Sequence, residues 1–275
     1  MKFEFLGTAA AEGYPGMFCT CANCRDARQK GGRSIRGRSQ ALVDDTVLID
    51  FPADTCMRVL QGKLDLPSLR HCLITHQHCD HLYATDLEMR QVGYAKVDDD
   101  IPFTMYGTEV TGRPIREVIE RFHLERDGRV RFQPVMPFVS FTIEDKYTVT
   151  PLPATHCEGA VIYLISDGEH TILYAHDTGW LNEETWNWLK ERRPQLSFVT
   201  IDCTFGPRPW REGHMGLPDA AEMLEQLRSI GCVNENTVAY VNHFSHNCDA
   251  DYDRLSAKAE PLGLLVSYDG CTVTL

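Results

Sequence analysis

Short apolar runs rich in Val, Ile, Phe and Tyr recur along the chain, and they constrain its fold more than any other feature. Each run is bounded by turn residues, which is typical of β-strands. Asp44 and Asp45 lie between two of the runs, and we expect a hairpin turn there. The predicted strands are Lys2–Leu6, Ala41–Val43, Val47–Ile49, His71–Thr75, Phe103–Tyr106, Val139–Ile143, Tyr147–Leu152, Val161–Ile165, Ile172–Tyr174, Phe198–Cys203 and Thr237–Val241.

Segments with helical spacing alternate with the later strands. A second strand-rich stretch starts near Val139, so the chain contains two similar halves of strands and helices. Two such halves predict two sheets packed on each other with helices outside, a four-layer α/β arrangement. We expect one domain over residues 1–275. The predicted helices are Ala53–Gln61, Pro114–Phe122, Asn182–Glu191, Pro218–Ile230 and Ala250–Ala259.

The charge balance limits the partners of the chain. Its 275 residues include 27 Lys and Arg against 39 Asp and Glu, for a formal net charge of −12. A nucleic-acid partner is not expected, because phosphate backbones require clustered basic charge. No apolar run approaches the roughly 18 residues of a membrane helix, and no signal peptide is visible. We therefore expect a cytoplasmic protein without a membrane partner; the oligomeric state stays open, and a homodimer is compatible with the sequence.

One segment departs from the acidic balance. Arg25–Arg38 holds six basic residues and one acid. A solvated loop or helix face and a contact with an anionic ligand are about equally compatible with this run. The candidate contacts to a substrate phosphate are Arg33, Arg36 and Arg38.

Eleven cysteines are an unusual number for this length. The odd count and the missing export signal argue against a disulfide framework. Most of the cysteines stand singly in apolar runs, where Cys behaves as a small buried hydrophobe; these include Cys56, Cys72, Cys203, Cys232 and Cys271. Three others are packed into six residues and do not fit that interpretation: Cys19, Cys21 and Cys24.

The strongest chemical signal is the segment Thr75–His81, which reads Thr-His-Gln-His-Cys-Asp-His. It follows directly on a predicted strand, and the carboxyl ends of strands are where ligand sites form in α/β folds. His76 and His78 are two residues apart in extended chain, so they point the same way and can hold one ion. Asp80 and His81 lie beyond the turn and can face a second ion. Imidazole and carboxylate ligands favour Zn, Mn or Fe.

A site for two metal ions needs about three protein groups per ion and a bridge, so more ligands must lie downstream. His156, Asp177 and His243 each follow a strand-like run. Each alone is a weak signal, but together with the first segment they complete the expected set. Asp202 also follows a strand, and we expect it behind the ligands. Core or surface roles are expected for His71, His123, His170 and His176.

The order His-x-His-x-Asp-His, then a later His, an Asp and a final His, resembles the metallo-β-lactamase superfamily. The resemblance spans nearly the whole chain, from Gly7-Thr8-Ala9 to His246. It implies an αββα sandwich with the metals at one edge. It also implies that one ion is held by His76, His78 and His156 and the other by Asp80, His81 and His243, with Asp177 bridging.

Within that superfamily, the segment Gly7–Gly13 followed by the three cysteines resembles the PhnP-type phosphodiesterases. In those enzymes three cysteines and a late histidine hold a structural zinc. The resemblance thus implies a zinc-bearing loop over residues 13–40, and a Cys₃His set matches structural zinc chemistry. Three unligated thiols or an iron–sulfur cluster are the alternatives, although a cluster usually takes four cysteines. The implied zinc ligands are Cys19, Cys21, Cys24 and His246.

A further segment, Gly213–Leu217, precedes a predicted helix. It resembles the Gly-His segment of PhnP-type and tRNA 3′-processing (RNase Z) members, and implies that His214 serves phosphodiester chemistry. The helix N-terminus beside it favours a phosphate oxygen. A helix cap or a surface residue is the alternative for His214.

These features predict a phosphodiesterase with two divalent ions, Zn or Mn, in the active site and one structural Zn. The two ions lower the pKa of a bridging water toward about 7, and the resulting hydroxide attacks phosphorus in line. His214 protonates the leaving oxygen or stabilises the charge on it. Asp80 is either a metal ligand only or a metal ligand that also transfers protons. By resemblance, the substrate is a small anionic cyclic phosphodiester such as 5-phosphoribosyl 1,2-cyclic phosphate.

Three other functions are compatible with parts of this pattern. RNase Z-like tRNA processing fits the Gly-His segment, but the charge of −12 opposes it. Hydrolysis of lactones, thioesters or β-lactams needs the first histidine segment, but not His214 or the cysteines. A non-enzymatic metal- or redox-sensing module would use the cysteines and His246.

Overall fold

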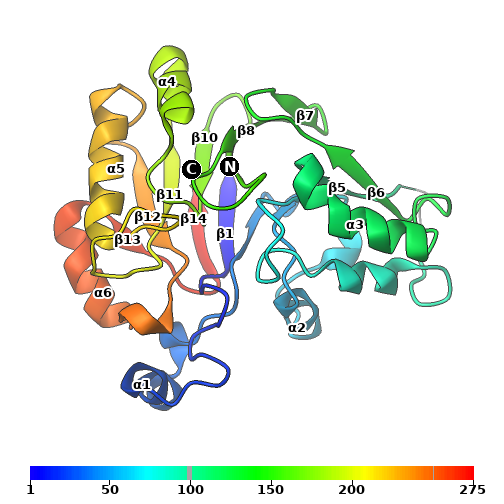
Figure 1. Ribbon diagram of the computed structural model, residues 1–275, viewed down its shortest axis with the longest axis horizontal. Helices are drawn as coiled ribbons and strands as arrows, with labels where there is room; N and C mark the ends of the chain where they lie inside the picture. Colours follow the sequence, from blue (N-terminus) through cyan, green and yellow to red (C-terminus); the bar gives the residue numbers. More distant parts are fainter. Residues whose placement is uncertain (98–100, 250) are drawn as a thin grey trace.

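Two β-sheets packed face to face form the centre of the structure, a computed structural model that describes residues 1–97, 101–249 and 251–275 (Figure 1). In spatial order, the first sheet contains β14 (Cys271–Thr274), β1 (Lys2–Gly7), β2 (Gln40–Val43), β3 (Val47–Ile49), β4 (His71–Leu73), β5 (Phe103–Gly107) and β6 (Val130–Pro134). The second contains β13 (Leu265–Val266), β12 (Val238–Asn242), β11 (Phe198–Asp202), β10 (Thr171–Ala175), β9 (Val161–Ser166), β8 (Tyr147–Pro153) and β7 (Phe141–Ile143).

Helices cover the outer faces of both sheets. Figure 1 shows α4 (Glu183–Arg192), α5 (Leu217–Ser229) and α6 (Tyr252–Ala259) beside the second sheet, and α2 (Asp54–Leu60) and α3 (Glu109–Arg121) beside the first. One buried apolar cluster lies under α4, α5 and α6, another lies under α3, and a third fills the space between the sheets. The predicted four-layer αββα arrangement is therefore confirmed.

Burial on both faces explains the composition of the central strands. All residues of β2, β3, β5 and β11 are buried, as expected for strands covered on both sides. Between the sheets, the ring centroids of Phe3 from β1 and Phe198 from β11 lie 4.9 Å apart. The predicted hairpin at Asp44 and Asp45 joins β2 to β3, and both residues adopt the positive φ that this turn requires.

Parallel pairing brings the carboxyl ends of several strands to one edge of the sandwich. β3, β4 and β5 run parallel in the first sheet, and β10, β11 and β12 run parallel in the second. A backbone bridge between Ala9 and Phe244 joins the segments that follow β1 and β12. Polar residues that follow these strands therefore meet at this edge.

Some elements differ from the prediction. α3 begins five residues before Pro114, because the Thr108 side chain accepts a hydrogen bond from the Thr111 N–H and caps an earlier start. α1 (Ala22–Lys30), β6, β13 and β14 were not predicted. In α1 only Cys24 and Ala27 are buried, so its sequence carries little helical periodicity.

Two further predictions concern α6 and Cys56. The predicted helix Ala250–Ala259 corresponds to α6, although Ala250 itself lies outside the described residues. Cys56 was expected in the core, but it is exposed on α2, while Cys72, Cys203, Cys232 and Cys271 are buried as expected.

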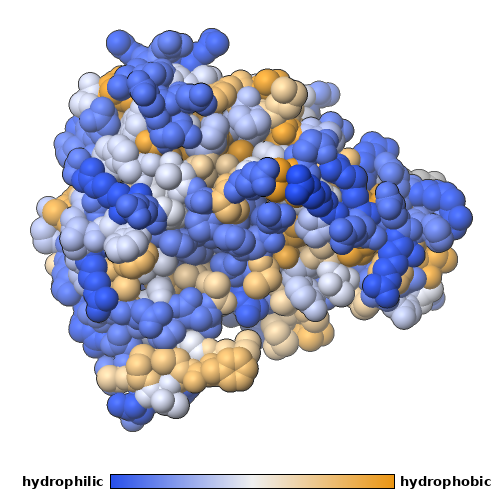
Figure 2. All heavy atoms as spheres, viewed as in Figure 1, coloured by the Kyte–Doolittle hydropathy of each residue, from blue (hydrophilic) through white to orange (hydrophobic). Residues whose placement is uncertain are grey.

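The surface in Figure 2 is mostly hydrophilic, with an apolar patch at its lower tip, where Figure 1 places α1 and the loop before it. That loop carries Met17 and Phe18, which are 66% and 95% exposed. Within the described ranges, every helix is too short or too polar to span a lipid bilayer.

Candidate metal centre

The structure brings the seven predicted active-site ligands together at the edge where the parallel strands end. Four of them follow β4, and the others follow β8, β10 and β12. Asp177 and His243 have positive φ values of 51° and 67°, so the chain turns sharply as it leaves β10 and β12. Non-glycine residues in this conformation concentrate at functional sites.

His76, His78 and His156 form the first group. His78 Nδ1 lies 3.0 Å from His76 Nε2 and 3.1 Å from His156 Nε2. Nitrogens that share a tetrahedral ion at about 2.1 Å are roughly 3.4 Å apart, so these separations fit one ion between the rings. Burial lowers the pKa of His76 to about 4, and burial also lowers the pKa of His156. Both rings are thus neutral at pH 7, as metal ligands must be.

Asp80, His81 and His243 form the second group together with Asp177. One ligand atom from each of these buried residues lies within 4.8 Å of all the others. His81 Nε2 is 3.2 Å from His243 Nε2 and 3.4 Å from Asp80 Oδ2. Three nitrogen or oxygen donors and a shared carboxylate suit a second divalent ion.

Asp177 lies between the two groups. Its Oδ2 is 3.2 Å from His76 Nε2 of the first group and 2.8 Å from His81 Nε2 of the second. Burial opposes the charged carboxylate, but His243 and His81 outweigh burial and hold its pKa well below the usual range. An ionised carboxylate that contacts both groups has the placement of a bridging ligand.

The electrostatics of the second group also fit a metal ion. Burial lowers the pKa of His81, but Asp50, Asp177 and Asp80 outweigh this and raise it well above the ordinary value. The surrounding carboxylates thus stabilise a positive charge at His81. A divalent ion supplies that charge and displaces the proton.

In three of the predicted ligand histidines, the ring nitrogen that faces away from the other ligands has its own partner. His81 Nδ1 lies 2.6 Å from Asp50 Oδ2, and His243 Nδ1 lies 2.7 Å from Thr204 Oγ1. His156 Nδ1 is 2.9 Å from the Gly213 carbonyl oxygen. Such contacts orient metal-binding imidazoles and select their tautomer.

Sequence reasoning missed Asp50. It is fully buried after β3, and its carboxylate also accepts hydrogen bonds from the backbone N–H and the hydroxyl of Thr75. Its position at the carboxyl end of a buried strand was the available signal. Asp202 lies behind the ligands, where it accepts hydrogen bonds from the backbone N–H groups of Asp177, Thr204 and Met215.

Cys157 was also missed. Its Sγ lies within 4.8 Å of the ligand nitrogens of His76, His78 and His156. Its direct proximity in sequence to His156 was the only signal. Burial raises the pKa of this thiol.

His214 lies beside the second group and is 27% exposed. Its Nδ1 is 2.9 Å from Asp177 Oδ1 and 3.4 Å from Asp202 Oδ2. Burial disfavours the charged ring, but hydrogen bonds to Asp177 and Asp202 outweigh burial and raise the pKa of His214 to about 10. With Nδ1 engaged, Nε2 is the nitrogen left to meet a substrate.

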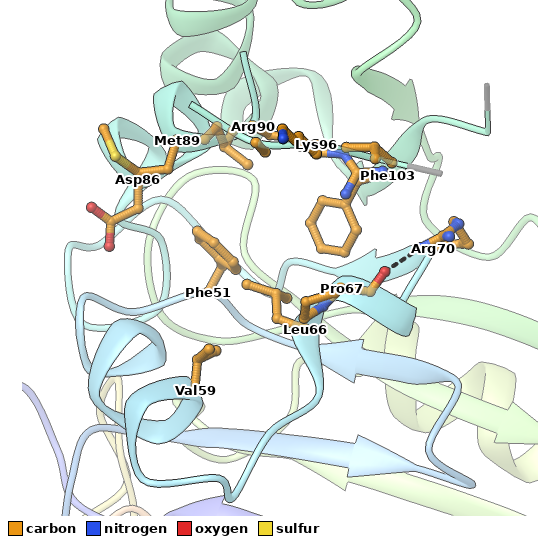
Figure 3. A pocket seen from close by; sticks show the side chains of 13 residues that line it. Phe51, Val59, Leu66, Pro67, Arg70, Asp86, Met89, Arg90, Lys96 and Phe103 are labelled. Carbon is orange, nitrogen blue, oxygen red and sulfur yellow. Dashed lines mark hydrogen bonds between the residues drawn. The ribbon is translucent and has the colours of Figure 1, made fainter. Parts of the chain in front are cut away.

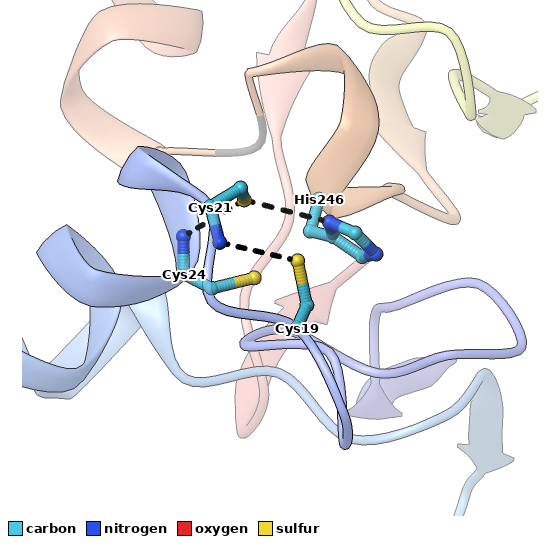
Figure 4. Close-up of side chains that lie close together, drawn as sticks. All are labelled: Cys19, Cys21, Cys24 and His246. Carbon is cyan, nitrogen blue, oxygen red and sulfur yellow. Dashed lines mark hydrogen bonds between the residues drawn. The ribbon is translucent and has the colours of Figure 1, made fainter.

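Cys19, Cys21, Cys24 and His246 meet at the amino-terminal end of α1 (Figure 4). Their ligand atoms all lie within 4.8 Å of one another, and His246 Nδ1 is 3.8 Å from Cys21 Sγ. A Cβ on Gly16 would come within 2.8 Å of the His246 ring, so only glycine admits the ring here. The donor set and its closeness fit a closed zinc site.

The thiols of this group differ in their electrostatics. A hydrogen bond from the Cys24 backbone N–H lowers the pKa of Cys21 to about 6, whereas burial raises the pKa of Cys24 to about 12. Zinc binds cysteines as thiolates, so zinc binding would displace the proton of Cys24.

The predicted arginine contacts do not fit a substrate phosphate. Arg36 is 2% exposed and donates hydrogen bonds to Thr8 Oγ1 and to the Ser267 carbonyl oxygen, so it is held inside the fold. Arg38 pairs with Asp54 at 3.1 Å. The Arg33 guanidinium stacks on Tyr268 and lines a hollow of 230 Å³ that contains none of the predicted ligands.

A separate cavity of 410 Å³ lies beside the first sheet (Figure 3). Phe51, Leu66, Met89 and Phe103 form much of its apolar lining, and none of the predicted ligands lines it. The backbone N–H of Phe51 donates to the His81 carbonyl oxygen at 2.7 Å, so one wall of the cavity adjoins the second ligand group.

Comparison with protein families gives one match over most of the chain. A model of the beta-lactamase superfamily domain matches residues 46–244. This range includes all seven predicted active-site ligands and His214, but not the cysteine group.

Individual proteins are similar over the full length. The chain is 24% identical to the coenzyme PQQ synthesis protein B of Klebsiella pneumoniae (strain 342), covering 100% of this chain and 98% of that protein. Zn²⁺-bound PqqB from Methylobacterium extorquens superposes with a TM-score of 0.78 at 20% identity, covering 100% of both chains. A diphosphatase of the PhnP family superposes with a TM-score of 0.76 at 20% identity, covering 100% of this chain and 97% of the other. At these identities the structural likeness establishes the fold.

Proposed function

The chain belongs to the metallo-β-lactamase superfamily, and from this premise we propose that it is a phosphodiesterase that hydrolyses a small cyclic phosphodiester with two divalent metal ions. 5-Phosphoribosyl 1,2-cyclic phosphate is the specific substrate that we propose. The observation that carries the proposal is the position of His214, whose Nδ1 lies 2.9 Å from Asp177 Oδ1 beside the seven predicted metal ligands.

The ligand groups have distinct roles in this proposal. His76, His78 and His156 would hold one ion, while Asp80, His81 and His243 would hold the other, with Asp177 between them. Bound there, two divalent ions would supply positive charge to the phosphoryl oxygens and acidify the attacking water. Zn and Mn are the ions that suit these donors. The acidic chain needs this charge, because the predicted arginines are engaged elsewhere.

His214 supplies the proton for the leaving oxygen. Asp177 and Asp202 lie 2.9 and 3.4 Å from its Nδ1, and their charges raise its pKa and so favour the protonated ring. Its Nε2 therefore carries a proton and can donate it to the oxygen that leaves phosphorus. Lactone and thioester hydrolysis does not require a charged donor at this position.

A substrate panel tests this function. The purified protein, loaded with Mn²⁺ or Zn²⁺, is assayed with bis-p-nitrophenyl phosphate, with cyclic phosphates of pentose phosphates, and with a lactone. We expect turnover of the phosphodiesters and the highest kcat/KM for a cyclic phosphate. Turnover of the lactone alone, or of no ester with either metal, would reject the proposal.

A role in coenzyme PQQ synthesis is the second candidate, favoured by the 24% identity over the full chain to a PQQ synthesis protein. Expression of this chain in a bacterium that lacks its PQQ synthesis protein B tests this role. Restored PQQ production would support it, and unchanged PQQ levels with soluble protein present would argue against it.

A further inference from the structure

His246 has a different partner on each ring nitrogen. Its Nδ1 faces the cysteine group, 3.8 Å from Cys21 Sγ (Figure 4). Its Nε2 faces the opposite way and lies 3.6 Å from Glu12 Oε1. The ring therefore stands between the three thiols and one carboxylate.

The Glu12 carboxylate is itself held in place. Oε1 accepts a hydrogen bond from the Ser245 hydroxyl and another from Asn247 Nδ2 at 3.5 Å. Ser245 and Asn247 are the two neighbours of His246 in the chain, so the Glu12 carboxylate is hydrogen-bonded to the turn that contains His246. The Glu12 side chain is 31% exposed, which leaves its charge partly shielded from water.

The same turn follows directly on the active-site edge. His243 precedes it, and the backbone N–H of Phe244 donates to the Thr8 carbonyl oxygen at 2.9 Å. The Ala10 N–H donates in turn to the Phe244 carbonyl oxygen at 3.0 Å. Residues 8–12 thus contact the short segment that connects His243 of the active-site ligands to His246 of the cysteine group.

A carboxylate beside the free nitrogen of a metal-binding imidazole has a known physical effect. It accepts the proton on that nitrogen, selects the tautomer whose other nitrogen has a free lone pair, and raises the basicity of that lone pair. Removal of such a partner typically costs 10- to 100-fold in metal affinity. The three cysteines already supply negative charge, so the imidazole ligand is the one that needs this orientation.

We propose that Glu12 is the orienting carboxylate of the cysteine–histidine zinc site, holding the proton of His246 on Nε2 and directing Nδ1 to the ion. Glu12 is thus a positioning residue that acts through His246 and does not touch the metal. The role is independent of the substrate and concerns the zinc site alone.

Cobalt binding tests the proposal, because thiolate-to-cobalt charge-transfer absorption reports ions bound by cysteines. Full-length parent and Glu12→Gln protein are titrated with Co²⁺ against a competing chelator, and Zn²⁺ affinity is then measured by displacement of the cobalt signal. The glutamine keeps an oxygen for Ser245 but removes the charge. We expect a 10- to 100-fold weaker affinity for both ions in Glu12→Gln.

Asp26→Asn is the matched control. Asp26 lies on α1 in the same region, but its carboxylate pairs with Arg254 at 3.6 Å. We expect its cobalt and zinc affinities to stay within twofold of the parent. Unchanged affinity in Glu12→Gln, or an equal loss in Asp26→Asn, would overturn the proposal.

The histidine tautomer provides a second measurement that needs no variant. In ¹⁵N-labelled, zinc-loaded parent protein, the His246 resonances should show a protonated Nε2 and a metal-bound Nδ1. The reverse assignment would overturn the proposal even if Glu12→Gln does not fold.

Discussion

His214 and Asp50 show how single side chains near the metal centre act through charge. His214 holds a proton because two carboxylates outweigh its burial, and Asp50 holds the His81 ring from behind. Neither residue is one of the seven predicted ligands, yet each contacts one of them: His214 contacts Asp177, and Asp50 contacts His81. Each leads to a prediction at the level of one residue.

Replacement of His214 should lower kcat and leave the metal content of the protein unchanged. In His214→Asn the leaving oxygen loses its proton donor, so we expect kcat on bis-p-nitrophenyl phosphate to fall by about 100-fold or more. Metal content, measured by elemental analysis, should match the parent. His170→Asn, in the turn between β9 and β10, is the control and should keep full activity. A His214→Asn enzyme with parental kcat would show that this ring is not the donor.

Replacement of Asp50 should affect metal binding first. Asp50→Asn removes the charge that accepts the His81 Nδ1 proton at 2.6 Å, so the ring loses its orientation. We expect a 10- to 100-fold weaker affinity for the ion held by Asp80, His81 and His243. Chelator competition followed by calorimetric titration with Mn²⁺ or Zn²⁺ measures this loss. If both ions bind as tightly as in the parent, Asp50 has no orienting role.

The site was partly predictable at this scale because local spacing carries information. His76, His78, Asp80 and His81 lie within six residues, so their density alone indicated a metal site. Asp50 contacts His81 across 31 positions of sequence, and no local pattern links the two. Cys157 had its neighbour His156 as the only signal.

Among the secondary-structure elements, the turn between β2 and β3 has a structural role that its sequence did not reveal. The Asp44 carboxylate accepts hydrogen bonds from the Lys2 backbone N–H at 2.6 Å, from Lys146 Nζ at 2.9 Å and from the Tyr147 hydroxyl at 2.8 Å. Lys2 belongs to the first sheet and Tyr147 to the second. The turn therefore joins the two sheets.

This turn leads to a prediction about pH. Burial raises the pKa of Asp44, but the Lys2 N–H and Lys146 outweigh burial and lower it below the ordinary 3.8. A lowered folded pKa stabilises the protein above the unfolded pKa, and this stabilisation is lost as the pH falls through the folded value. Asparagine also tolerates the positive φ at this position. We therefore expect the Asp44→Asn protein to lose only about 1 kcal/mol of unfolding free energy at pH 7.

Urea unfolding at several pH values measures this difference. The stability gap between parent and Asp44→Asn should be full at pH 6 to 7, begin to shrink near pH 4, and be lost as the pH falls through the lowered folded pKa of Asp44. A gap that is independent of pH would show that the charge of Asp44 is not responsible.

Element boundaries were predictable where periodicity was strong and not where capping decided them. α5 was predicted to within one residue at each end, because its buried positions repeat with helical spacing. α3 was predicted from Pro114 onward, since Pro favours the start of a helix, but the Thr108 cap moved the start to Glu109. β14 was missed because its pairing partner β1 lies at the other end of the chain.

At the scale of the whole molecule, the two sheets pack on each other through a buried apolar cluster. Phe3 is fully buried between them, with its ring centroid 4.9 Å from that of Phe198. Phe3→Ala removes a large side chain from a space that the rigid sheets cannot close, so we expect a loss of about 3 to 5 kcal/mol of unfolding free energy.

Phe18→Ala is the control for this prediction. Phe18 is the same residue type but is 95% exposed in the loop before α1. Urea unfolding of metal-loaded protein should show parental stability for Phe18→Ala and a clearly lower midpoint for Phe3→Ala. Equal midpoints in the two variants would mean that the space between the sheets repacks around the missing ring.

The sequence by itself determined the layered α/β architecture and predicted a set of candidate metal ligands, because strand periodicity and the spacing of the first four candidates are local properties. Only the tertiary structure decided that Asp177 lies between the two ligand groups, that His246 faces both the cysteines and Glu12, and that Arg36 is buried. These facts depend on which strands become neighbours and on which side chains the packing then covers. Such contacts join residues tens to hundreds of positions apart, and no local pattern encodes them.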